Sequence, residues 1–196
     1  MHKVIEKHFI REDGSTIENI MFNWETGELI AEVPTLLGYA DDSCWTRGQS
    51  WAIAGSLWAY EHTRNTHYLR VAGKLFDYWW DKVGADIPPW DFNDPSLDAP
   101  LDTSSSAIVC SALARLAVLD PLPEEAKPFT DRLEPMLENL CKHLTPVDSQ
   151  DERPVGMLLD GCMNGRKQVA HRNELIWGDF YLMEALYCLE KKGLAS

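Results

Sequence analysis

The sequence has no apolar run long enough to span a membrane, and its start, MHKVIEKHFIREDG, contains no hydrophobic core of a secretory signal. A transmembrane helix needs about twenty consecutive apolar residues, and a signal peptide needs a shorter apolar segment close to the N-terminus. We therefore expect neither a membrane-spanning helix nor classical secretion.

Basic residues are also scarce, because 18 lysines and arginines stand against 31 acids and the net charge is −13. A surface of this charge repels nucleic-acid phosphates and anionic lipid headgroups. We expect no nucleic-acid partner and no membrane partner.

Motifs of metal, thiol and serine chemistry are missing as well. The five cysteines are widely spread and never form CxxC, and the six histidines form neither HExxH nor a cluster with acids at ligand spacing. Reduced, mostly buried thiols in the cytoplasm are expected, with no metal site. GxSxG is absent, so helix capping explains the run Ser104 to Ser106 better than a nucleophile does.

What the sequence does contain is helical periodicity. Its 196 residues, 45% of them apolar and 25% charged, predict one folded domain over residues 1–196. Four long helices are predicted, at 43–60, 65–83, 103–119 and 174–192. Three further features are a short helix near the N-terminus, a helix over 121–144 interrupted near its prolines, and an extended pair of segments around a polar turn at Glu25 to Gly27.

These elements predict an all-α fold built from antiparallel helix pairs. Short and long connections alternate along the chain, which is typical of helix pairs stacked in a solenoid or arranged around a closed ring. No repeat of fixed period is present, so the ring is favoured over the solenoid.

The segment DDSCWTRGQSWAIAG, residues 41–55, concentrates the features of a binding site. A guanidinium among indole rings can pair with a carboxylate while the aromatic faces stack on a flat ring, so a sugar acid is a candidate ligand. Trp45 and Gln49 share one helical face, and Arg47 and Trp51 share another. The alternative is that the tryptophans belong to the core and Arg47 ties two helices together.

Two acids in apolar surroundings are weaker candidates. Asp91 lies between Trp90 and Phe92 in a proline-rich loop, where it is either a catalytic acid or an anchor that accepts backbone amides. Asp179 falls inside a predicted helix, where a buried acid requires a partner.

Four segments taken together resemble the unsaturated glucuronyl hydrolases of glycoside hydrolase family 88. They are, in order, DDSCWTRGQSWAIAG, PPWDFNDP, LDTSSSAIVCSALARL and LIWGDFYLMEAL. The resemblance implies an (α/α)6 barrel, of which this chain is the C-terminal half. It further implies a carbohydrate-active hydrolase that acts on unsaturated uronic-acid oligosaccharides released by polysaccharide lyases, without metal or organic cofactor.

By the same resemblance, Trp45, Arg47 and Trp51 match sugar-contacting residues of the family, and we expect Gln49 and Trp90 to line the sugar cleft with them. The family hydrates the C4–C5 double bond of the terminal uronate with the help of an aspartate. Its two catalytic aspartates precede the segment that matches EDGST, so the resemblance implies that this chain lacks both and leaves Asp91 as a weak candidate. The alternative is a non-catalytic helical scaffold or a sugar-binding remnant.

Three departures from the family pattern are visible. Glu18 stands where the family often has histidine, Leu36 and Leu37 replace His-Gln, and Phe180 replaces a common tyrosine. A half-ring also exposes the inner faces of its helices as a large apolar patch. We therefore expect that the chain either associates with itself through this face or belongs to a longer protein.

Overall fold

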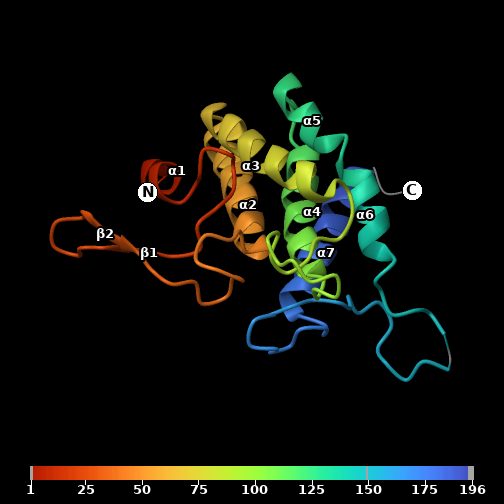
Figure 1. Cartoon of the computed structure of the whole chain (residues 1–196). Coiled ribbons are helices and arrows are strands. Elements are labelled where there is room, and N and C mark those ends of the chain that lie inside the picture. The colour runs from red at the N-terminus through yellow and green to blue at the C-terminus, as the bar shows by residue number, and fades with distance from the viewer. Residues whose placement is uncertain (1, 149, 194–196) are drawn as a thin grey trace.

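The fold is predominantly helical, in a computed structural model that describes residues 2–148 and 150–193 (Figure 1). Its elements, in chain order, are α1 (His2–His8), β1 (Ile20–Phe22), β2 (Leu29–Glu32), α2 (Thr46–Thr63), α3 (His67–Val83), α4 (Thr103–Ala117), η1 (Glu124–Ala126), α5 (Lys127–Thr130), α6 (Leu133–Cys141) and α7 (Ile176–Lys191).

Three of these helices, α2, α4 and α7, run parallel to one another, with α4 in the middle. Near the starts of their helices, the Trp177 ring N–H donates to the Ser104 hydroxyl at 3.1 Å. Further along the same two helices, Ser111 bonds to Glu184. On the other side of α4, Arg115 forms an ion pair with Glu61 of α2 at 2.9 Å. We call α2, α4 and α7 the inner helices.

The connecting helices run in the opposite direction and pack on the outside. Helix α3 packs against α2, and α6 packs against α4. The apolar residues of α3 recur every three or four positions, so one stripe is buried and the other side meets solvent; the buried stripe is Leu69, Val71, Ala72, Leu75, Phe76 and Trp79. The prediction of antiparallel helix pairs is confirmed.

The core is centred on α4. Almost every residue of this helix is buried, from Thr103 to Leu116, because neighbouring helices cover it on several sides. Its many serines and alanines allow those neighbours to approach closely, while larger side chains such as Leu113 fill the space between helices. Burying one such leucine contributes about 1.5–3 kcal/mol relative to leaving it exposed.

One predicted helix start is wrong by a few residues. Helix α2 begins at Thr46, not at Ser43, because the Ser43 hydroxyl is engaged in the preceding loop, where it donates to Asp91 at 2.7 Å. Helix α4 begins at Thr103, as predicted, with Asp102 as its N-cap. The segment 121–144 is broken between α5 and α6, and Pro135 lies in the first turn of α6, where a missing N–H is tolerated.

The predicted extended pair is an antiparallel hairpin. Strands β1 and β2 pair with Ile20 opposite Glu32, and the Asn23 side chain accepts the Glu25 N–H at 2.8 Å in the turn. The hairpin projects away from the helices (Figure 1), and Trp24 near its tip is 90% exposed.

The five cysteines carry free thiols. Cys44, Cys110 and Cys162 are buried, whereas Cys141 is exposed. Within residues 2–148 and 150–193, none of the helices has the length and apolar content needed to cross a membrane.

Candidate functional site

The N-terminal ends of α2, α4 and α7 meet at one end of the molecule. Arg47, in the first turn of α2, contacts Ser104 in the first turn of α4, and Ser104 in turn accepts the Trp177 ring N–H from α7. The first N–H groups of each helix point to this end and carry the positive pole of the helix dipole. The arrangement therefore creates an environment that favours negative charge.

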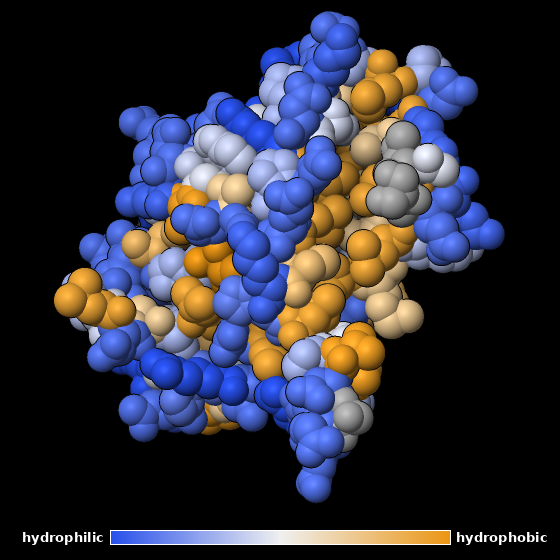
Figure 2. All heavy atoms as spheres, turned by 90° about the vertical axis from the view of Figure 1, so that its right-hand side faces the viewer, coloured by the Kyte–Doolittle hydropathy of each residue, from blue (hydrophilic) through white to orange (hydrophobic). Residues whose placement is uncertain are grey.

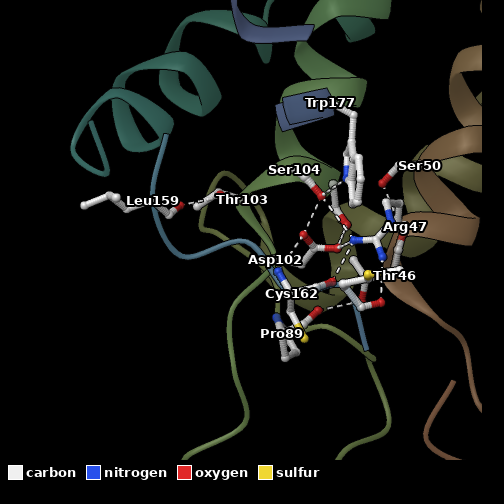
Figure 3. Close-up of polar contacts among 12 residues, drawn as sticks. Thr46, Arg47, Ser50, Pro89, Asp102, Thr103, Ser104, Leu159, Cys162 and Trp177 are labelled. Atoms are coloured by element: carbon white, nitrogen blue, oxygen red, sulfur yellow. Dashed lines mark hydrogen bonds and ion pairs between the residues drawn. The ribbon is translucent and has the colours of Figure 1, made fainter. Parts of the chain in front are cut away.

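Arg47 is the centre of a buried network at this end (Figure 3). Its guanidinium donates to Asp102 at 2.5 Å and to Ser104 at 3.2 Å. It also donates to the backbone carbonyls of Cys162 at 2.7 Å and Met163 at 2.9 Å. Arg47 thus ties α2 to the start of α4 and to the loop that leads toward α7.

The Asp102 carboxylate has no exposed surface and is fully used inside the protein. It accepts the Ser104 hydroxyl at 2.5 Å, the Ser105 hydroxyl at 2.8 Å and the Cys162 N–H at 3.3 Å, besides the ion pair with Arg47. The serine run is therefore explained by Asp102, because two of its hydroxyls satisfy a buried carboxylate. Sequence reasoning missed this role, which the spacing Asp-Thr-Ser-Ser at a helix start indicates.

Two indole rings flank the guanidinium. The Arg47 Cζ lies 4.9 Å from the Trp45 ring centroid and 5.4 Å from that of Trp177. Cations are attracted to the faces of aromatic rings at such distances. Trp45 belongs to the segment that the sequence singled out, whereas Trp177 was not singled out, although it belongs to the quoted segment LIWGDFYLMEAL.

Of the two sequence interpretations of Arg47, the structure shows the second. Arg47 is only 4% exposed, and the carboxylate that it binds is Asp102 of the chain itself. The expected free guanidinium is therefore corrected to a cation that joins helices. A contact between a sugar and Arg47 stays a prediction.

The Gln49 side chain is buried and bonds to the backbone of other segments. It has no exposed surface, and its amide donates to the carbonyls of Gly14 at 2.8 Å and Leu75 at 2.9 Å, while its oxygen accepts the Cys44 thiol. These bonds join the N-terminal segment to α3. The expected position of Gln49 in an open cleft is thus corrected, because no atom of it reaches solvent.

Trp90 and Asp91 are anchors of the proline-rich loop. Trp90 is 2% exposed and donates its ring N–H to Asp94 at 2.7 Å, and its ring packs against Gly165, where a side chain would collide with it. Asp91 is fully buried and accepts the Tyr39 N–H at 2.9 Å and the Ser43 hydroxyl at 2.7 Å. The anchor interpretation of Asp91 holds, and the expected exposure of Trp90 in a cleft is corrected.

Trp51 is the residue of the predicted set whose side chain reaches solvent most. It is 36% exposed, and its ring meets the Tyr181 ring edge-on at a centroid distance of 5.4 Å. Tyr181 also stacks near Trp58 at 6.3 Å. Trp51 therefore lies on the side of α2 that faces Tyr181 of α7, and it also lines an open apolar groove beside Gly55 and Trp58.

Two loops border the same end and contact each other. The Glu18 carboxylate accepts the N–H groups of Leu37 at 3.0 Å and Gly38 at 2.9 Å, which fixes the loop before α2. Asn164 donates to the Leu36 carbonyl at 3.1 Å from the loop before α7. The unusual acid at position 18 thus holds the loop backbone, and Leu36 is left 61% exposed on its surface.

The loop before α7 is strongly cationic. Its segment GRKQVAHR, residues 165–172, contains three basic residues and no acid, in a chain whose net charge is −13. Arg166, Lys167 and Arg172 are exposed. Gln168 and Ala170 have positive φ angles of 54° and 43°, a backbone conformation that non-glycine residues rarely adopt and that clusters at functional sites.

At this end of the molecule, the Asp179 carboxylate has a backbone partner and the Cys162 thiol is buried. Asp179 accepts the Leu158 N–H at 2.7 Å, which supplies the partner that the sequence required but did not identify. Burial raises the pKa of the Cys162 thiol from 9.0 to about 12.

Among residues 2–148 and 150–193, no group of three or more His, Cys, Asp or Glu side chains is arranged to hold a metal ion.

The comparisons with known proteins agree with this architecture. The unsaturated chondroitin disaccharide hydrolase of Streptococcus pneumoniae is 32% identical over 94% of this chain and 48% of its own length. The unsaturated glucuronyl hydrolase of Formosa agariphila is 31% identical over 92% of this chain and 44% of its own length. The chain is homologous to unsaturated glucuronyl hydrolases. It spans about half the length of the curated relatives that it matches.

Solved structures show the same partial coverage. The crystal structure of unsaturated glucuronyl hydrolase from Bacillus sp. GL1 matches with a TM-score of 0.83 and 26% identity over 97% of this chain and 50% of that one. An unsaturated glucuronyl hydrolase specific for heparin, 22% identical, matches with a TM-score of 0.85 and supports the fold alone. No protein-family model matches the chain. The predicted helix pairs of an (α/α)6 barrel are confirmed.

Proposed function

We propose that this chain is the C-terminal, sugar-binding half of an unsaturated glucuronyl hydrolase, folded as one domain. Its ligand is an unsaturated uronic-acid oligosaccharide. The observation that carries the proposal is the convergence of three inner-helix N-termini with the rings of Trp45, Trp51 and Trp177 at one end of the molecule.

The chemistry of this end suits an anionic sugar. Helix N-termini favour a carboxylate, and indole faces pack on the C–H groups of a pyranose. The exposed cations Arg166, Lys167 and Arg172 add positive charge beside the helix ends. In this proposal Arg47 acts indirectly. It lies between the Trp45 and Trp177 rings and fixes the position of the cationic loop through its bonds to the carbonyls of Cys162 and Met163.

Two related structures contain ligands that suit a first test. An unsaturated glucuronyl hydrolase variant from Streptococcus agalactiae, 26% identical, is complexed with dGlcA-GalNAc6S, and a second related structure contains dGlcA-Glc-Rha-Glc. Both ligands begin with an unsaturated glucuronate, as the proposed site requires. The sulfated disaccharide is the better first probe, since its second anionic group can interact with the cationic loop.

The test is a titration of dGlcA-GalNAc6S into the chain, followed both by calorimetry and by the ultraviolet absorbance of the C4–C5 double bond. We expect saturable binding that weakens about tenfold or more in Trp51→Ala. The matched control is Trp24→Ala, because Trp24 is a more exposed tryptophan on the distant hairpin, and its loss should leave affinity unchanged. Equal affinities for both variants, or no binding by the unaltered chain, would refute the sugar site.

Hydrolysis separates this proposal from a second candidate, a sugar-binding remnant without chemistry. The remnant is favoured by Asp91 and Asp102, since both are fully buried and engaged in hydrogen bonds, which leaves neither free to transfer a proton to a substrate. Binding with a steady loss of the double-bond absorbance supports the hydrolase. Binding with constant absorbance supports the remnant. The free thiols favour a reducing compartment, and we propose the cytoplasm.

A further inference from the structure

Helix α7 has two apolar faces, of which only one is covered. Gly178, Leu182 and Ala185 are buried against α4. On the opposite side, a line of large apolar residues recurs every three or four positions: Ile176 at 77% exposure, Phe180 at 56%, Met183 at 71% and Tyr187 at 58%. We call these four residues the α7 ridge. A surface helix normally has polar residues on this side, so the ridge is suited to packing against another helix.

Helix α2, at the other edge of the inner layer, has the complementary shape. Its outward side carries the small residues Ala52, Gly55 and Ala59, which line an apolar groove of about 360 Å³ whose walls include Trp51, Trp58 and Ile5 of α1. A Cβ built at Gly55 meets no atom within 4 Å, so the groove is open there. We call this side the α2 groove. Small residues at spacings of three and four form the depression into which a ridge of a neighbouring helix fits.

The ridge and the groove lie on opposite edges of one layer. Helix α4 packs between α2 and α7, and the three helices run parallel, so the ridge points away from α4 on one side and the groove points away on the other. Apolar side chains also gather into one broad area on the side that carries α6 (Figure 2). The molecule is thus an arc of three inner helices whose edges are unlike and complementary.

We propose that a second copy of this chain covers both edges. A two-fold rotation places the α7 ridge of each copy in the α2 groove of the other, so the same contact forms twice and the assembly closes. The closed ring has six parallel inner helices, three from each copy. Six is the number in the (α/α)6 barrels to which this chain is homologous over half of their length.

The area available is sufficient for a stable dimer. The four ridge residues and the neighbouring Leu186, 42% exposed, are on average about 60% exposed, and side chains of this size cover on the order of 150–250 Å² each, so they offer roughly 600 Å². The α2 groove of each copy adds further apolar surface. Stable interfaces bury about 600–1,000 Å² per partner, so the ridge alone reaches the lower end of this range.

Charge opposes the association but does not lie in the contact. Each copy has a net charge of −13, and two such chains repel. The ridge residues are uncharged, and the lining of the groove includes one histidine and no acid. Salt screens the long-range repulsion and leaves apolar contact intact, so the dimer should strengthen as ionic strength rises.

The test is the molar mass in solution by sedimentation velocity and light scattering. We expect twice the chain mass of 22.3 kDa at micromolar concentration and 0.15 M salt. Met183→Asp on the ridge and Gly55→Leu in the groove should each weaken dimerisation at least a hundredfold while the circular dichroism of the fold is unchanged. The control Leu97→Asp alters a fully exposed apolar residue outside both surfaces and should not change the mass.

Complementation distinguishes this arrangement from any other dimer. Met183→Lys and Gly55→Asp should each be monomeric alone, whereas a mixture should form a heterodimer, because one contact gains a Lys–Asp pair and the other is unaltered. A monomeric native chain, a dimer that Met183→Asp leaves intact, or variants that do not complement each other would overturn the proposal. Trp51 lines both the α2 groove and the proposed sugar site, so the molar mass is measured without sugar and on variants that keep Trp51.

Discussion

The two most informative regions of this molecule are the N-terminal ends of the inner helices and the outward face of α7. At the first, charged side chains are buried, and Arg47 and Asp102 each have several partners. At the second, large apolar side chains such as Ile176 are exposed. In the buried network, the polar groups are satisfied by partners within the chain. The exposed apolar ridge, in contrast, is a surface suited to packing against another segment or protein. The chain therefore folds firmly at one end and remains open at one edge.

The largest effect is expected from Asp102→Ala. The substitution leaves the buried Arg47 guanidinium without its anion and two serine hydroxyls without an acceptor. Breaking a buried pair from one side costs about 3–5 kcal/mol of unfolding free energy. Urea denaturation monitored by tryptophan fluorescence measures this loss.

The control for this change is Asp98→Ala, which removes an exposed acid from a neighbouring loop and should cost less than about 0.5 kcal/mol. The double variant Arg47→Met with Asp102→Leu should be less destabilised than the sum of the single variants, since no charge is left buried. Additive losses would mean that the two residues do not act as a pair.

The next largest effect compares the two faces of α7 directly. Leu182→Ala removes a 3% exposed side chain from the contact with α4 and should cost about 2–5 kcal/mol. Ile176→Ala on the ridge, at 77% exposure, should cost less than about 0.5 kcal/mol in the dilute monomer. At high protein concentration the second variant should lose stability too, because dimerisation then contributes. Equal losses in dilute solution would contradict the description of the ridge as free.

A smaller effect is expected from Gln49→Ala. The carbonyls of Gly14 and Leu75 lose their donor in a place without solvent, which costs about 1–3 kcal/mol. Sugar affinity should be unchanged, because Gln49 has no exposed surface. A variant with native stability and impaired sugar binding would restore the original sequence prediction for this residue.

The smallest effect concerns pH. Burial raises the pKa of the Cys44 thiol from 9.0 to about 11, so this thiol keeps its proton in the folded chain while the unfolded chain loses it near pH 9. The folded state then binds more protons, and the free energy of unfolding falls as pH rises from about 9 to 11. Cys44→Ser removes this titration and keeps a donor for Gln49. The free energy of unfolding of the variant should therefore fall less steeply over this pH range than that of the unaltered chain. Identical slopes would show that Cys44 does not contribute.

Sequence patterns predicted the helices well and the site only partly. The apolar stripe of α3 and the turn in the hairpin are local features, so their positions followed from spacing and turn residues. The start of α2 was missed because a long-range partner decides it, since the Ser43 hydroxyl bonds to Asp91. Trp177 was missed for the same reason, since its neighbours Arg47 and Ser104 lie far away in the chain.

The sequence by itself determined that this chain is helical, that its helices form antiparallel pairs, and that its segments resemble one hydrolase family, because these depend on periodicity and on the order of motifs. Only the tertiary structure decided what each polar residue does. Arg47 and Gln49 are residue types that ligand sites often contain. In this chain, however, both are buried and bond to groups from other segments. Whether a polar side chain faces solvent or another helix depends on packing between distant segments, which the sequence alone does not display.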